Sequence, residues 1–92
     1  IYIPTAFTPN KDLHNDYFLP IIEGDAVSEY NLRIYNRFGA TLFMTEDTNE
    51  AWDGKINEGT EYASAGHYAY HIRIIDFKGK ERAYQGTLTL IR

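Results

Sequence analysis

The richest group of potential metal ligands in this chain is the segment 10–16, Asn-Lys-Asp-Leu-His-Asn-Asp. Side-chain oxygens at such short spacing are what a hard cation such as calcium requires. Lys11 places a positive charge inside the loop, and Leu13 stands where a tight cation-binding turn favours Gly. A turn whose Asn and Asp side chains accept backbone N–H groups explains the same pattern. We therefore expect no cofactor beyond weak calcium binding by Asn10, Asp12, Asn15 and Asp16.

Catalysis has few residues to use. Ser28 and Ser64 are the only serines, and neither lies in the Gly-x-Ser-x-Gly setting that exposes a catalytic hydroxyl, so we interpret both as loop residues. His67 and His71 are four residues apart, which on a strand separates them by about 13 Å, too far to share a metal ion. The chain has no cysteine and is too short to build the deep cleft of a glycosidase. We predict no catalytic residue and no enzyme activity.

Trp52 is a candidate for stacking on a sugar ring. It precedes Asp53-Gly54 in a polar segment, and a flat indole in a loop offers its face to a pyranose. The same residue could instead fill the core from a turn, and Trp is largely buried on average. We predict that Trp52 is buried, whereas an exposed indole would favour a carbohydrate-binding module.

The elements that must position these residues are strands. Apolar and polar residues alternate with period two over 67–75, where one face holds Tyr68, Tyr70, Ile72 and Ile74. A second alternating run, 82–92, follows the turn-like segment 76–80, and the two runs predict a hairpin. The runs 30–34 and 41–44, joined by a turn at 37–40, predict another hairpin.

Shorter strands are predicted at 1–3 and 18–22. The second contains Pro20, which cannot donate to a ladder and therefore belongs at a sheet edge. Segment 49–64 is polar and glycine-containing, and it predicts a long loop around Trp52. No segment shows sustained 3.6-residue periodicity, so the pattern is typical of a β-sandwich or a small barrel.

Length and charge limit the class of protein further. A chain of 92 residues holds one small domain, and its net charge of -4 repels both nucleic acid and anionic lipid. No apolar run approaches the roughly 20 residues of a membrane helix. The chain starts without an initiator Met or a basic leader, so we expect residues 1–92 to be a domain excised from a larger exported protein. Because Arg92 directly follows a predicted strand, we expect it to be the natural C-terminus.

Several short motifs follow one another in an order that resembles a known family. They are Ala6-Phe7-Thr8-Pro9-Asn10, Asn15-Asp16, Ile34-Tyr35-Asn36-Arg37-Phe38-Gly39, Trp52-Asp53-Gly54, Gly66-His67-Tyr68 and Gly86-Thr87-Leu88-Thr89-Leu90-Ile91-Arg92. Over the whole chain they resemble the gliding motility-associated C-terminal domain, the type B sorting domain of the type IX secretion system in Bacteroidota. Lys11 and Leu13 depart from the two Gly of the family's Asn-Gly-Asp-Gly pattern. Phe38 replaces the usual Trp of its Asn-Arg-Trp-Gly turn, where we expect the aromatic packing to be kept.

The resemblance implies a single immunoglobulin-like antiparallel β-sandwich of about seven strands. It also implies that the domain directs a larger adhesin or surface enzyme through the periplasm and outer membrane to the cell surface or the medium. Its partners would be outer-membrane components of the secretion machinery, in some systems including a dedicated barrel-type helper protein. Neither nucleic acid nor a membrane-spanning segment of the domain's own is expected.

A sorting signal must be recognised, and two surfaces are candidates: the loop from Phe7 to Asp16 and the terminal strand from Thr87 to Arg92. Either could be recognised by its shape or by edge pairing. The residues that we assign to recognition are Phe7, Thr8, Pro9, Asn10, Thr87, Thr89 and Arg92. The alternative hypothesis is an adhesive or carbohydrate-binding β-sandwich module, which would gather aromatic and amide side chains on one exposed face.

Overall fold

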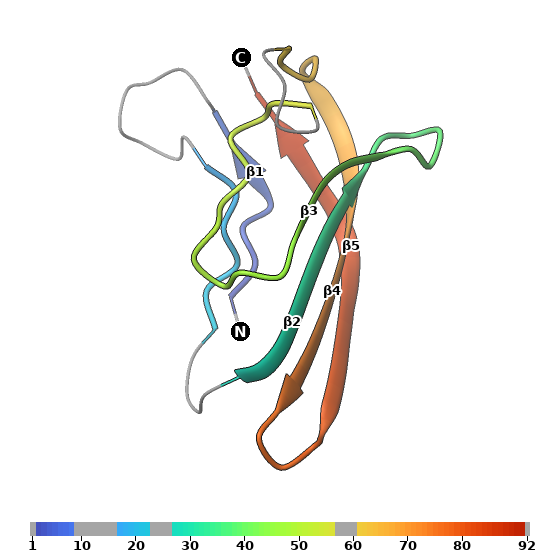
Figure 1. Cartoon of the computed structure of the whole chain (residues 1–92). Helices are drawn as coiled ribbons and strands as arrows, with labels where there is room; N and C mark the ends of the chain where they lie inside the picture. The colour runs from blue at the N-terminus through green and yellow to red at the C-terminus, as the bar shows by residue number, and fades with distance from the viewer. Residues whose placement is uncertain (1, 9–16, 23–26, 57–60, 92) are drawn as a thin grey trace.

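The chain folds around one β-sheet, seen in a computed structural model that describes residues 2–8, 17–22, 27–56 and 61–91 (Figure 1). Within these ranges it is all-β and contains no helix. The sheet has five strands, in the spatial order β1 (Ala6–Phe7), β5 (Glu81–Leu90), β4 (Gly66–Asp76), β2 (Val27–Tyr35) and β3 (Thr41–Thr45). Two hairpins therefore lie side by side, joined through β4 and β2. The all-β prediction is confirmed.

The β4–β5 hairpin is the longest pairing in the sheet, with Tyr68 opposite Leu88 and Ile72 opposite Tyr84. Tyr68, Ile72 and Ile74 are buried, and Tyr70 packs against the core from a partly buried position. This is the inward face that the alternating residues predict. The prediction holds because a one-residue slip would move every one of these side chains into water.

The β2–β3 hairpin is also confirmed, with Leu32 opposite Thr45 and Ile34 opposite Phe43. Leu32 and Ile34 are completely buried. The register shifts after Ile34, an irregularity next to the turn that lets the strand bend at its end. On its other side β2 pairs antiparallel with β4, so its inward residues meet the core between two neighbouring strands.

Both hairpins turn through the same device, an Asn or Asp side chain that accepts two backbone N–H groups. In the β2–β3 turn, Oδ1 of Asn36 accepts from Phe38 and Ala40 at 2.9 and 3.0 Å. In the β4–β5 turn, Oδ1 of Asp76 accepts from the residues two and four positions later, also at 2.9 and 3.0 Å. A glycine three positions after each lies at φ 85° and 81°, in the left-handed region that glycine adopts without strain.

Strand β1 departs from the predicted antiparallel pattern. It pairs parallel with β5, Ala6 opposite Thr89 and Phe7 opposite Leu90, whereas the other three pairings are antiparallel. Parallel pairing is slightly weaker per residue. A strand of two residues loses little by it, and it gains burial for Phe7.

The two short strands predicted near the N-terminus form isolated bridges instead, Tyr2 with Ile21 and Phe18 with Trp52. Together with the segment that follows β3, they lie across one face of the sheet as a second layer (Figure 1). Pro20, which is buried between the two bridges, lacks the N–H that would extend them into a ladder. The described residues therefore show five strands in one sheet rather than the predicted seven.

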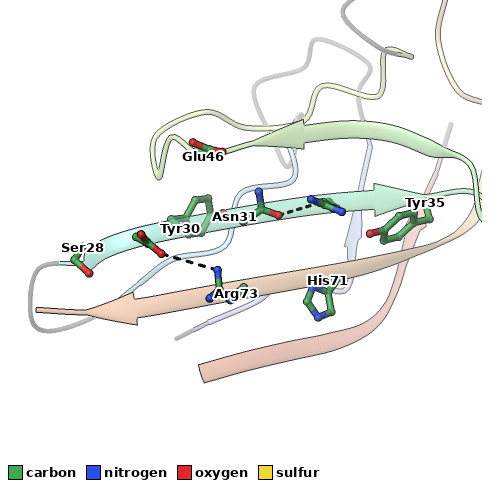
Figure 2. Close-up of a pocket in the computed structure, with 9 residues that line it drawn as sticks. Ser28, Tyr30, Asn31, Tyr35, Glu46, His71 and Arg73 are labelled. Atoms are coloured by element: carbon green, nitrogen blue, oxygen red, sulfur yellow. Dashed lines mark hydrogen bonds and ion pairs between the residues drawn. The ribbon is translucent and has the colours of Figure 1, made fainter. Parts of the chain in front are cut away.

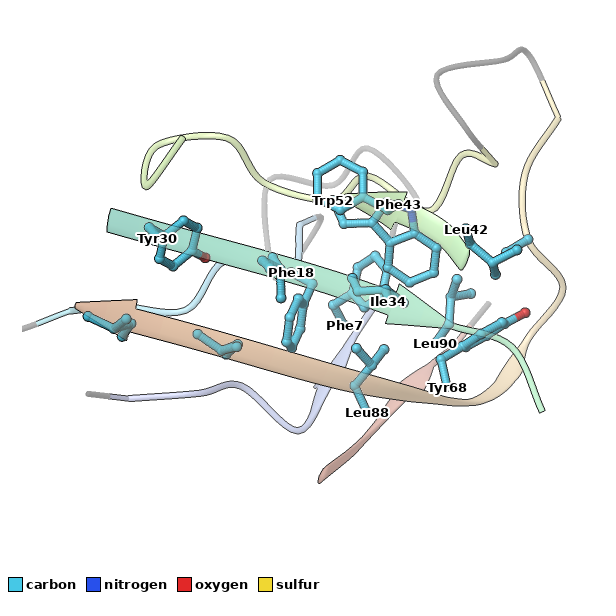
Figure 3. Packing of buried hydrophobic residues seen from close by; sticks show 14 residues of the cluster. Phe7, Phe18, Tyr30, Ile34, Leu42, Phe43, Trp52, Tyr68, Leu88 and Leu90 are labelled. Carbon is cyan, nitrogen blue, oxygen red and sulfur yellow. The ribbon is translucent and has the colours of Figure 1, made fainter. Parts of the chain in front are cut away.

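The core fills the space between this layer and the sheet (Figure 3). Trp52, none of whose surface is exposed, lies with its ring centroid 5.4 Å from that of Phe7 and 5.6 Å from that of Tyr68. Its Nε1 donates to the carbonyl of Lys55 at 2.8 Å, which satisfies the one polar atom of the indole. The predicted burial of Trp52 is confirmed. The predicted loop around it is confirmed as irregular backbone with single bridges.

Gly86 of β5 is required by a tyrosine on the neighbouring strand. Tyr70 stands opposite it and packs its ring 5.9 Å from that of Phe18. A Cβ at position 86 would lie 2.6 Å from the Tyr70 hydroxyl and 2.9 Å from the ring carbon that bears it. The glycine therefore makes room for the aromatic contact that ties β4 to the second layer.

Tyr30 brings an unmet polar group into the core. Its ring is only 5% exposed, and its buried hydroxyl has no hydrogen-bond partner among the described residues. Burial raises the pKa of Tyr30 from 10.0 to about 12, because the tyrosinate would be desolvated there. The position thus favours the neutral phenol strongly.

Candidate functional site

Phe7, the first residue of one recognition segment, lies beside the terminal strand in the structure. Strand β1 lies against the end of β5, where the N–H of Thr89 donates to the carbonyl of Thr5 and that of Ile91 to the carbonyl of Phe7, both at 2.9 Å. Each of these hydrogen bonds joins residues more than 80 positions apart, and nothing in the sequence indicates that they pair. Of the first candidate surface only Phe7 and Thr8 belong to the described residues, and Phe7 lies next to the terminal strand.

The side chains at this junction divide between core and surface. Phe7, 1% exposed, packs in the core, as do Leu88 and Leu90. Thr87 is exposed and Thr89 partly exposed on the opposite face, where Oγ1 of Thr89 lies 3.0 Å from Nδ1 of His67. Thr8 is partly exposed, and Pro9, Asn10 and Arg92 lie outside the described residues.

Edge pairing is restricted by the same contact. At Thr89 the backbone of β5 is engaged on both sides, by β4 and by β1. Over Glu81–Thr87, no described strand pairs with the second side of β5. An incoming strand would therefore find its open edge there, rather than at the terminal residues.

The proposed calcium ligands, Asn10, Asp12, Asn15 and Asp16, all lie outside the described residues. Within the described ranges, no group of three His, Asp or Glu side chains is arranged to hold a metal ion. His67 and His71 both lie on β4, which is flanked by β5 and β2, so they are surface rather than edge residues.

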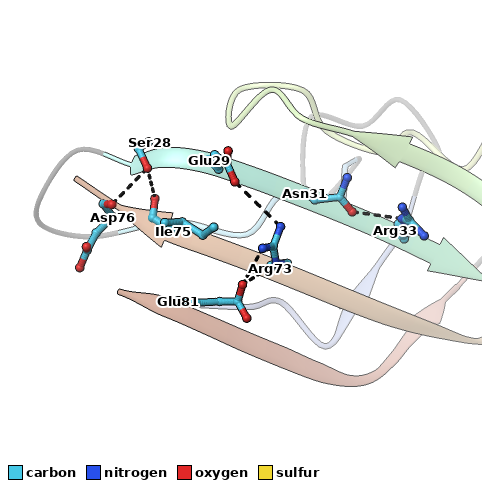
Figure 4. Close-up of polar contacts among 8 residues, drawn as sticks. All are labelled: Ser28, Glu29, Asn31, Arg33, Arg73, Ile75, Asp76 and Glu81. Atoms are coloured by element: carbon cyan, nitrogen blue, oxygen red, sulfur yellow. Dashed lines mark hydrogen bonds and ion pairs between the residues drawn. The ribbon is translucent and has the colours of Figure 1, made fainter. Parts of the chain in front are cut away.

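The serines have structural roles. Ser64 lies in the loop before β4, as predicted, but Ser28 lies in β2, which corrects its interpretation as a loop residue. The Ser28 hydroxyl hydrogen-bonds the carbonyls of Ile75 and Asp76 at 3.0 and 3.1 Å (Figure 4). It thereby fastens the start of β2 to the end of β4, where the register shifts.

The outer face of the sheet carries an open hollow of about 640 Å³ (Figure 2). Tyr35 from β2 and His71 and Arg73 from β4 face it (Figure 2), and Asn31 and Arg33 of β2 also line it. The arrangement follows from strand pairing, because Asn31 stands opposite Arg73, and Arg33 opposite His71. These side chains are the outward half of the alternation that builds the core.

Arg73, one of the charged residues in this hollow, is already paired. Arg73 Nη2 lies 2.6 Å from Glu81 Oε1, its Nε donates to the same oxygen at 2.7 Å, and Nη1 lies 3.9 Å from Glu29 (Figure 4). Arg33 Nε donates to Oδ1 of Asn31 at 3.1 Å. Because these groups are about half exposed, the pairs contribute little stability. The hollow is an open, polar surface of the sheet.

A smaller hollow, of about 340 Å³, opens at the other end of β2, beside the β2–β3 turn. Its apolar lining comes from Leu42, Ile56, Ala63 and Tyr68, and Arg37 and Phe38 form part of its rim. Phe38 is 80% exposed, so the expectation that it plugs the structure is wrong. The turn is closed by Asn36, and the aromatic ring is left outside, with Cζ of Arg37 4.8 Å from its centroid.

Comparison with known families identifies the family of this chain. The model of the CHU_C type IX secretion signal domain matches residues 1–90. The chain belongs to this family. No curated protein matches the chain.

Membership in the CHU_C family assigns the domain a sorting role. Members are secretion signals rather than catalysts, and a type IX signal implies contact with the secretion machinery and export from the cell. No helix in the described ranges is long and apolar enough to cross a membrane.

The structure also explains most of the motif series. Phe7, Trp52, Leu88 and Leu90 are core residues, and Asn36 closes a turn. Asp53 also closes a turn, since its Oδ1 accepts from the N–H of Lys55 at 3.0 Å, next to Gly54 at φ 90°. The exposed exceptions among the described motif residues include Arg37, Phe38 and Thr87.

Proposed function

We propose that the domain is a C-terminal sorting signal that directs a larger protein through the type IX secretion system to the cell surface or the medium. The observation that carries this proposal is the family match, which spans residues 1–90. The cargo would lie on the N-terminal side of the domain and be exported with it. The partners are outer-membrane components of the machinery, including a barrel-type helper protein.

The junction of β1 with the end of β5 supports terminal recognition. A receptor that contacts Thr8 and the outward side chains of β5 would read both chain ends at one place. The isolated bridges of the second layer support an immunoglobulin-like sandwich, with this layer as its reduced second sheet.

A secretion assay tests the proposal. A periplasmic reporter carrying this domain at its C-terminus is expressed in a host with a working type IX system and in a matched host without one. We expect surface or extracellular reporter in the first host and periplasmic reporter in the second. Equal retention in both hosts would overturn the sorting role.

Changing Thr87 and Thr89 to Ala tests the terminal strand separately. These side chains lie on the outward face, so the variant should fold like the parent by circular dichroism. We expect the folded variant to accumulate in the periplasm. Normal export would remove these residues from the recognition surface and leave the segment after Phe7 as the remaining candidate.

The alternative, a carbohydrate-binding module, is favoured by one observation, the outer-face hollow with Tyr35 and the amide of Asn31. Burial of Trp52 counts against it, because the indole offers no stacking face. A glycan array probed with the domain separates the two functions. Binding that is lost in Tyr35→Ala and Asn31→Ala would support the alternative.

A further inference from the structure

The β2–β3 turn exposes an aromatic side chain that the fold does not use. Phe38 is 80% exposed, and the side chain of Asn36 closes the turn by accepting two backbone N–H groups. The backbone adds two more hydrogen bonds at 3.0 Å, from Asn36 to the Ala40 carbonyl and from Gly39 to the Asn36 carbonyl. The backbone that carries the ring is therefore held in place, with the ring in water. Because the turn is preorganised, binding through Phe38 would lose little conformational entropy.

Arg37 adds a positive charge beside this apolar ring. Its guanidinium lies over the ring of Phe38, 4.8 Å from the centroid, in cation–π geometry. Among the described residues Arg37 makes no ion pair, since the salt bridges found there belong to Arg73. A stacked guanidinium keeps its N–H edges free for a carboxylate. The pair thus presents an apolar surface and an unused cation together.

The hollow beside the turn gives this pair a binding pocket. Leu42, Ile56, Ala63 and Tyr68 supply an apolar lining, and none of the described residues that line the hollow is a carboxylate. The chain as a whole has a net charge of -4, so a pocket rimmed by Arg37 differs from its surroundings in charge. An acidic partner would be repelled over most of the domain and attracted here.

We propose that Arg37, Phe38 and the adjoining hollow form a docking surface for a protein partner that presents an apolar side chain next to a carboxylate. The apolar side chain would enter the hollow against Phe38, and the carboxylate would pair with Arg37. Tyr, Trp, Phe and Arg are the residues enriched at the energetic centres of interfaces. The inference rests on the proposed function, since the partner belongs to the export machinery.

The second turn supplies matched controls. Phe77 is 72% exposed in a turn with the same hydrogen bonds, yet it lines neither of the two hollows. Phe38→Ser and Phe77→Ser remove the same exposed ring at two different places. Arg37→Glu and Lys78→Glu make the same change in net charge, one in each turn.

The test follows delivery of a reporter fused to the intact domain in a host with a working type IX system. We expect Phe38→Ser and Arg37→Glu to reduce surface delivery about tenfold or more, the change that a loss of about 1.4 kcal/mol in binding produces. Phe77→Ser and Lys78→Glu should deliver like the parent. Thermal unfolding of each purified variant verifies that the domain still folds.

Three outcomes separate the hypotheses. Parental delivery by folded Phe38→Ser and Arg37→Glu variants overturns the docking surface and leaves the sorting function intact. Equal loss from both turns also overturns it, because the effect would not be specific to this end of the sheet. If the unaltered domain delivers no reporter, the sorting function itself fails.

A photo-crosslinking residue at position 38, compared with one at 77, tests the chemistry of the partner in living cells. A crosslink from 38 alone to a peptide of the secretion machinery that contains Asp or Glu supports the proposal. A crosslink to lipid, or to a peptide without a carboxylate, overturns the assigned occupant.

Discussion

The turns of the two hairpins have the same hydrogen bonds but differ in the surface beside them. Asn36 and Asp76 accept equivalent pairs of backbone N–H groups, and each turn exposes one phenylalanine. Only the β2–β3 turn adjoins the hollow that Phe38 lines. Identical backbone chemistry therefore explains the Asx and glycine positions in both turns. It does not explain the two phenylalanines, whose side chains take no part in the hydrogen bonds of the turns.

The hairpins also differ in the tyrosines that they bury. Tyr68 of β4 donates its hydroxyl to the Ser64 carbonyl, whereas the hydroxyl of Tyr30 in β2 has no partner among the described residues. An unmet buried hydroxyl costs free energy that a bonded one recovers. The β2–β3 hairpin thus tolerates a polar defect at the end of the sheet opposite its turn.

The largest expected effect is a loss of folding stability at alkaline pH that comes from Tyr30. The pKa of Tyr30 is about 12 in the folded chain and 10.0 in the reference state, so the group contributes stability that is present below pH 10 and is lost as pH rises through 12. At pH 12 the loss should be about 2 kcal/mol. Tyr30→Phe should remove this part of the decline, measured by denaturant unfolding of the variant and the parent at pH 8 and pH 12.

At neutral pH we expect the reverse order of stability loss, because the hydroxyl of Tyr68 has a hydrogen-bond partner. Tyr68→Phe should cost about 1 kcal/mol through the unmet Ser64 carbonyl, while Tyr30→Phe should cost nothing. Equal losses in the two variants would show that Tyr30 has a partner in the folded protein.

A second effect concerns the inside of the β4–β5 hairpin. Gly86→Ala places a Cβ 2.6 Å from the Tyr70 hydroxyl, and the ring cannot move away without losing its contact with Phe18. We expect a loss of about 1–2 kcal/mol by chemical denaturation. The double variant Gly86→Ala, Tyr70→Leu should be less destabilised than the sum of the two single variants, because the shorter side chain removes the clash. Strict additivity would contradict the assigned cause.

The turns themselves should respond alike, at a smaller scale. Asn36→Ala and Asp76→Ala each remove two hydrogen bonds to exposed backbone N–H groups, at an expected cost of about 1 kcal/mol. The carboxylate of Asp76 should make its turn the more sensitive, because charge-assisted hydrogen bonds are stronger. Thermal unfolding of the two variants measures the difference. A much larger loss in Asn36→Ala would mean that its turn has contacts beyond those described.

How far the sequence predicts this molecule depends on the range of the interaction. Period-two alternation is local, so the hairpins and the inward face of Tyr68 and Ile72 follow from it. The parallel pairing of β1 with β5 is not local, and no pattern in Ala6–Phe7 specifies its direction. Trp52 could be placed in the core because burial follows from residue type, but the exposure of Phe38 could not. The turn that carries Phe38 is closed by Asn36, so the turn's residue pattern does not show whether the ring is buried.

The smallest expected effect is that of removing the exposed phenylalanine from each turn. Phe38→Ser and Phe77→Ser should each change the free energy of unfolding by less than about 0.5 kcal/mol, because both rings are exposed and neither turn depends on them. Chemical denaturation of the two purified variants beside the parent measures this. If both values are small while only Phe38→Ser reduces export, the phenylalanine of the β2–β3 turn acts on a partner rather than on the fold. A loss of 2 kcal/mol or more, as a buried ring would give, would instead return Phe38 to a structural role and make any export defect a consequence of instability.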